Sequence, residues 1–281
     1  DTSVGLLFYD IDKNYLRNYY KKPGDLDNLA NNTTQITMDD EGNVWCVNYN
    51  GTIWKYDSEE YAANTNDMAF KQTSLQINGT AYSIYKNKNN ELMVGSEDGL
   101  YFFDLSTNAA SISKNISGNN KSLSSNRILY IYEGMNGLIY LGTDNEGVII
   151  LDLYQKNFLS FRNNPLNNKS LLDNYVHGFA EDDMGQIWVG TNLGVSQFRK
   201  KQLDFINHSF EGIEGFKPKV NTICAGNYPN LWIGTSVGLL KYNTASRNYK
   251  WFKHSQESNT LANNEVFSLH LDDGREILWV G

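Results

Sequence analysis

A short phrase with the pattern apolar-Trp-apolar-Gly-Thr-x-x-Gly-apolar recurs along this 281-residue chain. Its full, loosened or degraded copies begin at Val44, Leu92, Ile139, Ile187, Leu231 and Leu278. The positions equivalent to the Trp are 45, 93, 140, 188, 232 and 279, so neighbouring copies lie 44 to 48 residues apart. That interval is typical of one four-stranded blade, and the chain is therefore predicted to be a repeat protein.

The repeat from residue 173 to 210 shows how one copy can form a blade. Asn174–Glu181 has the small and apolar residues of an inner strand, and Asp182–Gly185 has the composition of a tight turn. Ile187–Thr191 is predicted to form the second strand and Val195–Phe198 the third, with an alternating outer strand at Leu203–Ile206. Related turns recur at 39–42 and, shortened, at 272–274, and outer strands recur at 158–161 and 249–252.

These strands predict an all-β chain, a β-propeller of four-stranded antiparallel blades. A twisted four-stranded sheet cannot bury both faces alone, so neighbouring blades must pack on each other. The Gly after each Trp would let adjacent backbones approach, and the later Gly would supply positive φ for a turn. A linear solenoid would predict a shorter repeat.

One propeller domain is predicted for residues 1–281. Its blades are predicted at about 21–60, 61–107, 108–162, 163–210 and 211–255, with a last blade shared between 256–281 and 1–20. The shared blade follows from the match of Thr2–Leu7 to Thr235–Leu240, which directly follows a Trp phrase. Six repeats are visible, and a six-blade portion of a seven-bladed propeller is the alternative.

Composition excludes several classes of function. A net charge of −8 and a pI near 5.0 oppose binding to nucleic acid or to anionic membrane surfaces, because both need clustered Lys and Arg. The apolar runs are far shorter than a membrane span, so no membrane contact is expected of this chain, although both ends look cut from a longer polypeptide. Cys46 and Cys224 are predicted to be small buried hydrophobic residues rather than disulfide or metal partners.

Phe179–Val195 and Leu231–Tyr242 resemble the two-component regulator propeller repeat, as do the linking segments Lys169–Asn174 and Asn259–Asn264. The resemblance implies a periplasmic sensor region of a hybrid histidine kinase of the kind common in gut Bacteroidetes, which detects glycan fragments. It further implies an inner-membrane-anchored parent, with an oligosaccharide ligand, the remainder of the sensor kinase and a homodimer through the parent as partners. Met93 replaces the usual Trp and Asn48 the usual Gly.

No catalytic or metal-binding constellation stands out. His177, His208, His254 and His270 fall at unrelated phases of the repeat, without a second ligand at metal spacing. The Asp-Asp pairs at 39, 182 and 272 recur from blade to blade, which indicates turn formation rather than paired catalytic carboxylates. No nucleophile elbow or phosphate loop occurs, so neither enzyme activity nor a cofactor is expected of this chain.

A binding site is easier to place than a catalytic one. Loops leading into the inner strands and loops joining second and third strands lie on one face of a propeller blade, where several blades can contact one ligand. Their polar and aromatic residues suit the hydroxyl groups and C–H surfaces of a sugar. The candidate ligand-binding residues are Tyr49, Glu97, Asp98, Asn126, Arg127, Asp144, Glu146, Tyr175, His177, Asn192 and Asn264.

Three functions remain open at this point. The leading hypothesis is a noncatalytic extracytoplasmic module that senses a glycan or oligosaccharide for a downstream histidine kinase. The alternatives are a protein-interaction scaffold, which predicts no small-molecule binding, and a polysaccharide-degrading propeller enzyme, which predicts two or more carboxylates converging in one cleft.

Overall fold

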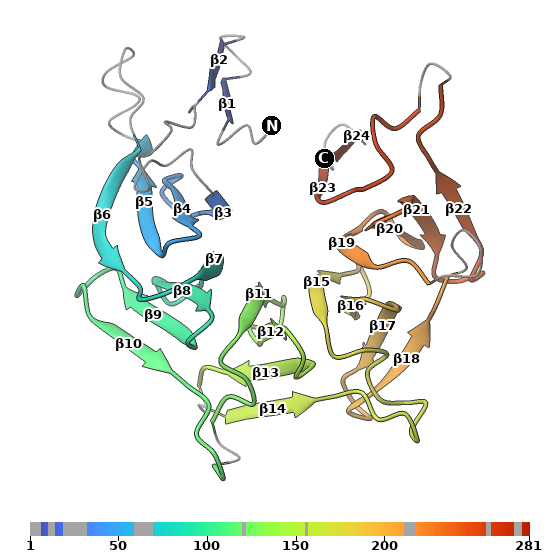
Figure 1. Cartoon of the computed structure of the whole chain (residues 1–281), viewed down its shortest axis with the longest axis horizontal. Helices are drawn as coiled ribbons and strands as arrows, with labels where there is room; N and C mark the ends of the chain where they lie inside the picture. Colours follow the sequence, from blue (N-terminus) through green and yellow to red (C-terminus); the bar gives the residue numbers. More distant parts are fainter. Residues whose placement is uncertain are drawn as a thin grey trace. The chain divides into compact units, whose positions relative to one another are not determined.

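The computed structural model describes residues 7–10, 15–18, 33–58, 70–119, 122–154, 157–210, 217–256, 260–272 and 277–281. The elements it shows are β-strands in antiparallel sheets (Figure 1). Within these residues there are five four-stranded sheets and two two-stranded ones, and each follows the order of the chain. The chain divides into two compact units, Asp1–Ile131 and Tyr132–Gly281, called here the first and second unit.

The first unit holds a two-stranded sheet and two complete blades. The two-stranded sheet pairs β1 (Leu7–Asp10) with β2 (Tyr15–Asn18). The next blade consists of β3 (Thr33–Met38), β4 (Val44–Asn48), β5 (Thr52–Tyr56) and β6 (Lys71–Gln76). The second consists of β7 (Ala81–Lys86), β8 (Glu91–Ser96), β9 (Leu100–Asp104) and β10 (Ala110–Ser113).

The boundary between the units falls within β11 (Ile128–Glu133), the first strand of a blade that continues through β12 (Ile139–Thr143), β13 (Val148–Asp152) and β14 (Asn157–Phe161). The next blade is β15 (Val176–Glu181), β16 (Ile187–Thr191), β17 (Gly194–Arg199) and β18 (Asp204–His208). The last complete blade is β19 (Val220–Ala225), β20 (Asn230–Thr235), β21 (Gly238–Asn243) and β22 (Tyr249–Phe252). A two-stranded sheet, β23 (Leu269–Asp272) and β24 (Ile277–Val280), follows.

The repeated glycines do what the sequence predicts. A Cβ atom at Gly190 would lie 2.8 Å from the Val220 side chain of the next blade, and one at Gly234 would lie 2.7 Å from Val266. These distances are too short for a side chain, so glycine is required where the blades of the second unit approach each other. Gly194 has φ of +132° at the turn into β17, as expected for the later glycine of the phrase.

The Asp-containing turns are structural, as predicted. Asp182 accepts hydrogen bonds from the amides of Met184 and Gln186 at 3.0 Å, and from the Trp188 indole at 2.8 Å. Asp39 binds the Trp45 indole in the same way at 2.8 Å. Burial alone would raise the pKa of Asp39, but its hydrogen bonds from Trp45 and the neighbouring turn hold that pKa below its ordinary value. The turn carboxylate therefore fixes the Trp of its own blade.

Blades pack through these Trp and apolar side chains. In the first unit, Trp45 and Ile53 share a buried cluster with Ile84 and Leu92 of the next blade. In the second unit, Trp188 packs with residues of β19 to β21, including Ile233. The blade cores are thus built between neighbouring sheets, as the repeat predicts.

The structure differs from the sequence prediction at two outer strands and at one cysteine. The outer strands β6 and β10 belong to the blades before the predicted boundaries at 61 and 108. Cys46 is buried, and burial raises its pKa to about 12, whereas Cys224 is only half-buried, so the prediction of burial is wrong there. Thr2–Leu6 and the turn residues 273 and 274 lie outside the described residues, and the shared last blade stays a prediction.

Candidate functional site

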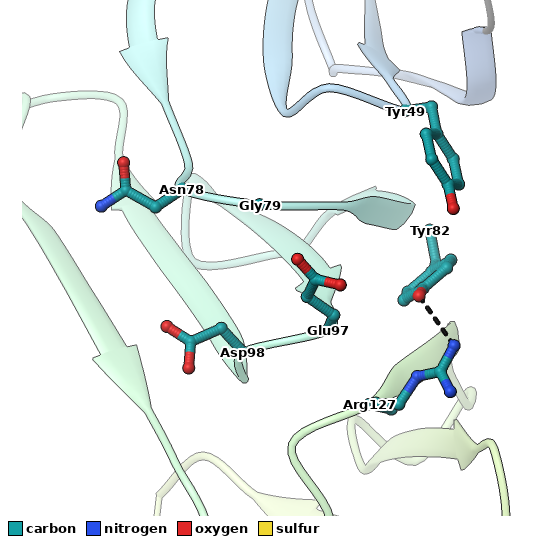
Figure 2. A pocket seen from close by; sticks show the side chains of 7 residues that line it. All are labelled: Tyr49, Asn78, Gly79, Tyr82, Glu97, Asp98 and Arg127. Atoms are coloured by element: carbon teal, nitrogen blue, oxygen red, sulfur yellow. Dashed lines mark hydrogen bonds between the residues drawn. The ribbon is translucent and has the colours of Figure 1, made fainter.

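An open cavity of about 670 Å³ lies in the first unit (Figure 2). Its walls come from the residue after β4, the β6–β7 loop and the start of β7, the β8–β9 loop and the residue before β11. The lining residues are Tyr49, Asn78, Gly79, Tyr82, Glu97, Asp98 and Arg127. Two blades and the chain leading into a third therefore contribute to one site.

Two tyrosines form the aromatic part of the cavity. The ring centroids of Tyr49 and Tyr82 lie 6.3 Å apart, with the ring planes at 80°. Tyr49 is 52% exposed, so its ring is available to a ligand. Arg127 donates from Nη2 to the Tyr82 hydroxyl oxygen at 2.9 Å, and its guanidinium carbon lies 5.6 Å from that ring's centroid. This contact holds the guanidinium group beside the aromatic pair.

Each of the two carboxylates that line the cavity has a partner. Glu97 Oε1 accepts a hydrogen bond from the Thr80 amide at 3.0 Å. Gly79 has φ of +88°, and a Cβ atom there would overlap the Glu97 carboxylate, so glycine makes room for this side chain. Asp98 forms an ion pair with Lys114. In Figure 2 the Glu97 carboxylate points toward the chain at Gly79, and that of Asp98 points away from the two tyrosines.

The cavity therefore offers ring surface, hydrogen-bond acceptors and a guanidinium donor within one concave surface. Ring faces can contact the C–H groups of a sugar, while carboxylate and guanidinium groups can bind its hydroxyls.

Four of the predicted residues, Tyr49, Glu97, Asp98 and Arg127, are brought together in this cavity. Asn126, which directly precedes Arg127, instead accepts a hydrogen bond from the Asn115 amide at 2.6 Å and so fixes the linking segment between blades. Three lining residues, Asn78, Gly79 and Tyr82, were not predicted from the sequence. The Asn-Gly pair is a turn signal that could have placed the first two.

Four of the predicted residues of the second unit form two pairs. Asp144 and Tyr175 are joined by an isolated β-bridge, and His177 Nε2 lies 2.7 Å from Asn192 Oδ1. Burial is the main cause that lowers the pKa of His177, and the charge of Lys219 acts in the same direction.

The other two predicted residues of this unit have partners elsewhere in the chain, Arg162 after β14 and His254 after β22. Glu146 forms an ion pair with Arg162 at 2.9 Å. Asn264 Oδ1 accepts a hydrogen bond from the His254 amide at 2.7 Å, the same role that Asn126 has in the first unit.

The part of the chain that the structure describes has neither a metal-binding cluster nor a membrane-spanning helix. No group of three or more His, Cys, Asp or Glu side chains there could hold a metal ion. No helix among those residues is long and apolar enough to span a membrane.

Residues 170–193 match a family described as the two component regulator propeller. The resemblance found from the sequence is thereby confirmed over this segment. No curated protein sequence matches the chain.

Similar solved structures are propeller domains. One is the extracellular domain of a protein of B. thetaiotaomicron assigned to a one component system, with a TM-score of 0.77, 18% identity, and coverage of 99% of this chain and 37% of that one. A second structure of the same protein's extracellular domain, there assigned to a hybrid two component system, has a TM-score of 0.76, 17% identity, and coverage of 99% of this chain and 36% of that one. The chain thus spans little more than a third of that extracellular domain.

An enzyme shares the fold as well. Virginiamycin B lyase from Staphylococcus aureus, in a catalytically inactive form with quinupristin, has a TM-score of 0.71 at 11% identity, with coverage of 98% of this chain and 83% of that one. At such low identities the similarity shows the fold alone, so the fold is a β-propeller of four-stranded blades, and function must be argued from the site.

Proposed function

We propose that this chain is a noncatalytic, extracytoplasmic ligand-sensing module of a hybrid two-component system. It binds an oligosaccharide in the cavity beside Tyr49 and signals to a downstream histidine kinase of the parent protein. The observation that carries the proposal is the combination of an exposed and a half-buried tyrosine ring, a carboxylate and a guanidinium group in one cavity of about 670 Å³. The regulator-propeller match of residues 170–193 and the extracellular neighbours support it.

The cavity suits a neutral or weakly charged sugar bound by contacts of several kinds. The exposed Tyr49 ring would lie against the C–H face of one sugar ring. Glu97 would accept hydrogen bonds from adjacent hydroxyls, because its backbone contact to Thr80 already fixes its position. Arg127 would contribute a donor from the facing wall.

The geometry favours binding over glycoside hydrolysis. Glu97 and Asp98 both line the cavity, but they are consecutive residues whose carboxylates point in different directions (Figure 2). Asp98 is also neutralised by Lys114. A hydrolase needs two carboxylates facing each other across the scissile bond, so this arrangement supports a noncatalytic role.

In the parent protein the module would be periplasmic, with the rest of an inner-membrane-anchored sensor kinase as its partner and a homodimer formed through the parent. Ligand binding would bias the parent only if one signalling state binds the sugar more tightly than the other. The cavity draws on two complete blades, so a ligand could favour one arrangement of their loops.

The test is calorimetry of the chain with a panel of neutral and acidic oligosaccharides. Tyr49→Ala is expected to weaken binding by about tenfold, because it removes the exposed ring. Tyr154→Ala is the matched control, since Tyr154 is 87% exposed and lies in the second unit. If no oligosaccharide binds, or if the two variants bind equally well, the proposal is wrong and the interaction-scaffold alternative is favoured.

A further inference from the structure

The blade β3–β6 contains two carboxylates beside its Trp. Asp39 lies six residues before Trp45 and accepts the indole N–H at 2.8 Å. Lys55 lies opposite Trp45 in the β4–β5 register, with its Nζ 5.5 Å from the centroid of the Trp ring. Asp57, two residues after Lys55, pairs with that ammonium at 3.2 Å. The Trp45 indole and the Lys55 ammonium therefore each have a carboxylate partner.

The blade β19–β22 keeps the Trp and the Lys but lacks both carboxylates. Lys241 lies opposite Trp232 in the β20–β21 register, with its Nζ 5.0 Å from the centroid of the Trp ring. The residue six positions before Trp232 is Gly226, and the residue two positions after Lys241 is Asn243. Lys250 lies opposite Lys241 on β22 and adds a second positive charge.

A cavity of about 220 Å³ lies at this position in the second unit. Its lining residues are Gly226, Asn227, Asn230, Trp232, Lys241, Leu271 and Leu278. A Cβ atom at Gly226 would be 3.2 Å from Trp232 Nε1, so a side chain there would enter the space beside the indole. The glycine thus leaves open the position that a carboxylate occupies in the other blade.

Two donors at this cavity, the Trp232 indole N–H and the Lys241 ammonium, lack an anionic partner among the described residues. Among the described residues, the Trp232 indole nitrogen has no hydrogen-bond acceptor and Lys241 has no carboxylate partner. No Asp or Glu lines the cavity, although the chain as a whole carries a net charge of −8. Leu271 and Leu278 supply an apolar wall.

We propose that this cavity is a binding site for a small carboxylate. Its oxygens would accept hydrogen bonds from the Trp232 indole and the Lys241 ammonium, in place of the missing Asp, with its apolar portion against Leu271 and Leu278. The volume of about 220 Å³ is below the range for drug-sized ligands, so the ligand is a compact monocarboxylate. The site shares no residue with the cavity beside Tyr49 and goes beyond the sensing function.

The test follows the Trp232 indole N–H resonance in the ¹⁵N-labelled chain, assigned from its loss in Trp232→Phe. Benzoate is expected to shift this resonance with saturation, whereas its neutral methyl ester should not. Lys241→Gln should weaken benzoate binding by about fivefold through loss of one charge-assisted hydrogen bond. Lys55→Gln is the matched control, because Lys55 already has Asp57 as its partner, and it should leave benzoate binding unchanged.

A second pair of variants tests the missing carboxylate directly. Gly226→Asp should shift the indole resonance without added ligand and abolish benzoate binding, because it supplies a carboxylate within the chain. Gly226→Asn fills similar space without the charge and should not reproduce the ligand-free shift. The proposal is overturned if benzoate fails to saturate by about 50 mM, if the ester or sulfate acts equally well, if Lys241→Gln binds normally, or if the two Gly226 variants behave alike.

Discussion

The hydrogen bond between Asp182 and Trp188 gives the sharpest test of how a blade is held. Asp182 is 6% exposed and Trp188 is 1% exposed, and the indole donates to the carboxylate at 2.8 Å. A hydrogen bond to a charged group contributes about 1.5–3 kcal/mol, and an unpaired buried donor is costly to leave. Asp182→Ala removes this acceptor and those of the Met184 and Gln186 amides, so a loss of about 3 kcal/mol in the free energy of unfolding is expected.

A double-mutant cycle separates the hydrogen bond to the Trp188 indole from the hydrogen bonds that Asp182 accepts from the Met184 and Gln186 amides. Phenylalanine at position 188 has no N–H, so Asp182→Ala should cost about 2 kcal/mol less in a Trp188→Phe background. The free energies come from urea denaturation followed by circular dichroism, because the substitution changes the fluorescence.

The control is the blade β7–β10, where Asn87 stands at the position of the Asp and Met93 at that of the Trp. The thioether of Met93 has no N–H, so a cycle of Asn87→Ala and Met93→Leu should give a coupling under about 0.5 kcal/mol. If the two cycles give equal couplings, the carboxylate does not anchor the Trp and the reasoning fails.

Two further predictions concern His208 and Gly79. His208 lies 2.9 Å from the Tyr242 hydroxyl, and burial lowers its pKa from 6.5 to about 4. Between these two pH values the unfolded chain binds more protons than the folded chain, so the free energy of unfolding should fall as the pH is lowered from 6.5 to about 4. In His208→Gln this pH dependence should be weaker. Urea midpoints measured across this pH range check the prediction, and an equal pH dependence in the variant and the unchanged chain would contradict it. Gly79→Ala should destabilise the chain by about 1–2 kcal/mol more than Gly118→Ala, because both glycines have positive φ but only Gly79 lies against Glu97. Equal melting curves for the two variants would contradict this prediction.

Much of the fold could be predicted because the repeat encodes local physics. The glycines at 190 and 194 and the Asp182 turn are required by close approach, positive φ and hydrogen bonding, all of which leave a mark in sequence. The outer strands β6 and β10 are harder to predict from the sequence, because an edge strand buries little apolar surface and so has a weak pattern of apolar residues. Every side chain of β6 is either exposed or half-buried, and many polar sequences are compatible with such a strand.

The site was predicted less completely, because side-chain direction depends on register. Asn126 and Arg127 are neighbours in one loop, yet the first binds the Asn115 amide and the second lines the cavity. The sequence predicts that Asn126 and Arg127 lie in the same loop, but it does not show which of them binds the linking segment. Tyr82 was missed because a tyrosine on an inner strand is as typical of a blade core as of a site.

Comparing blades within the chain separates these roles on physical grounds. Asn126, Asn174 and Asn264 stand at the same phase, and each accepts a backbone N–H from the linking segment before it. The next positions differ: Arg127, Tyr175 and Glu265. A scaffold contact must be made in every blade, so it repeats, whereas a ligand needs its contacts once. Positions where one blade departs from its neighbours, such as Arg127 and Gly226, are therefore where binding is best sought.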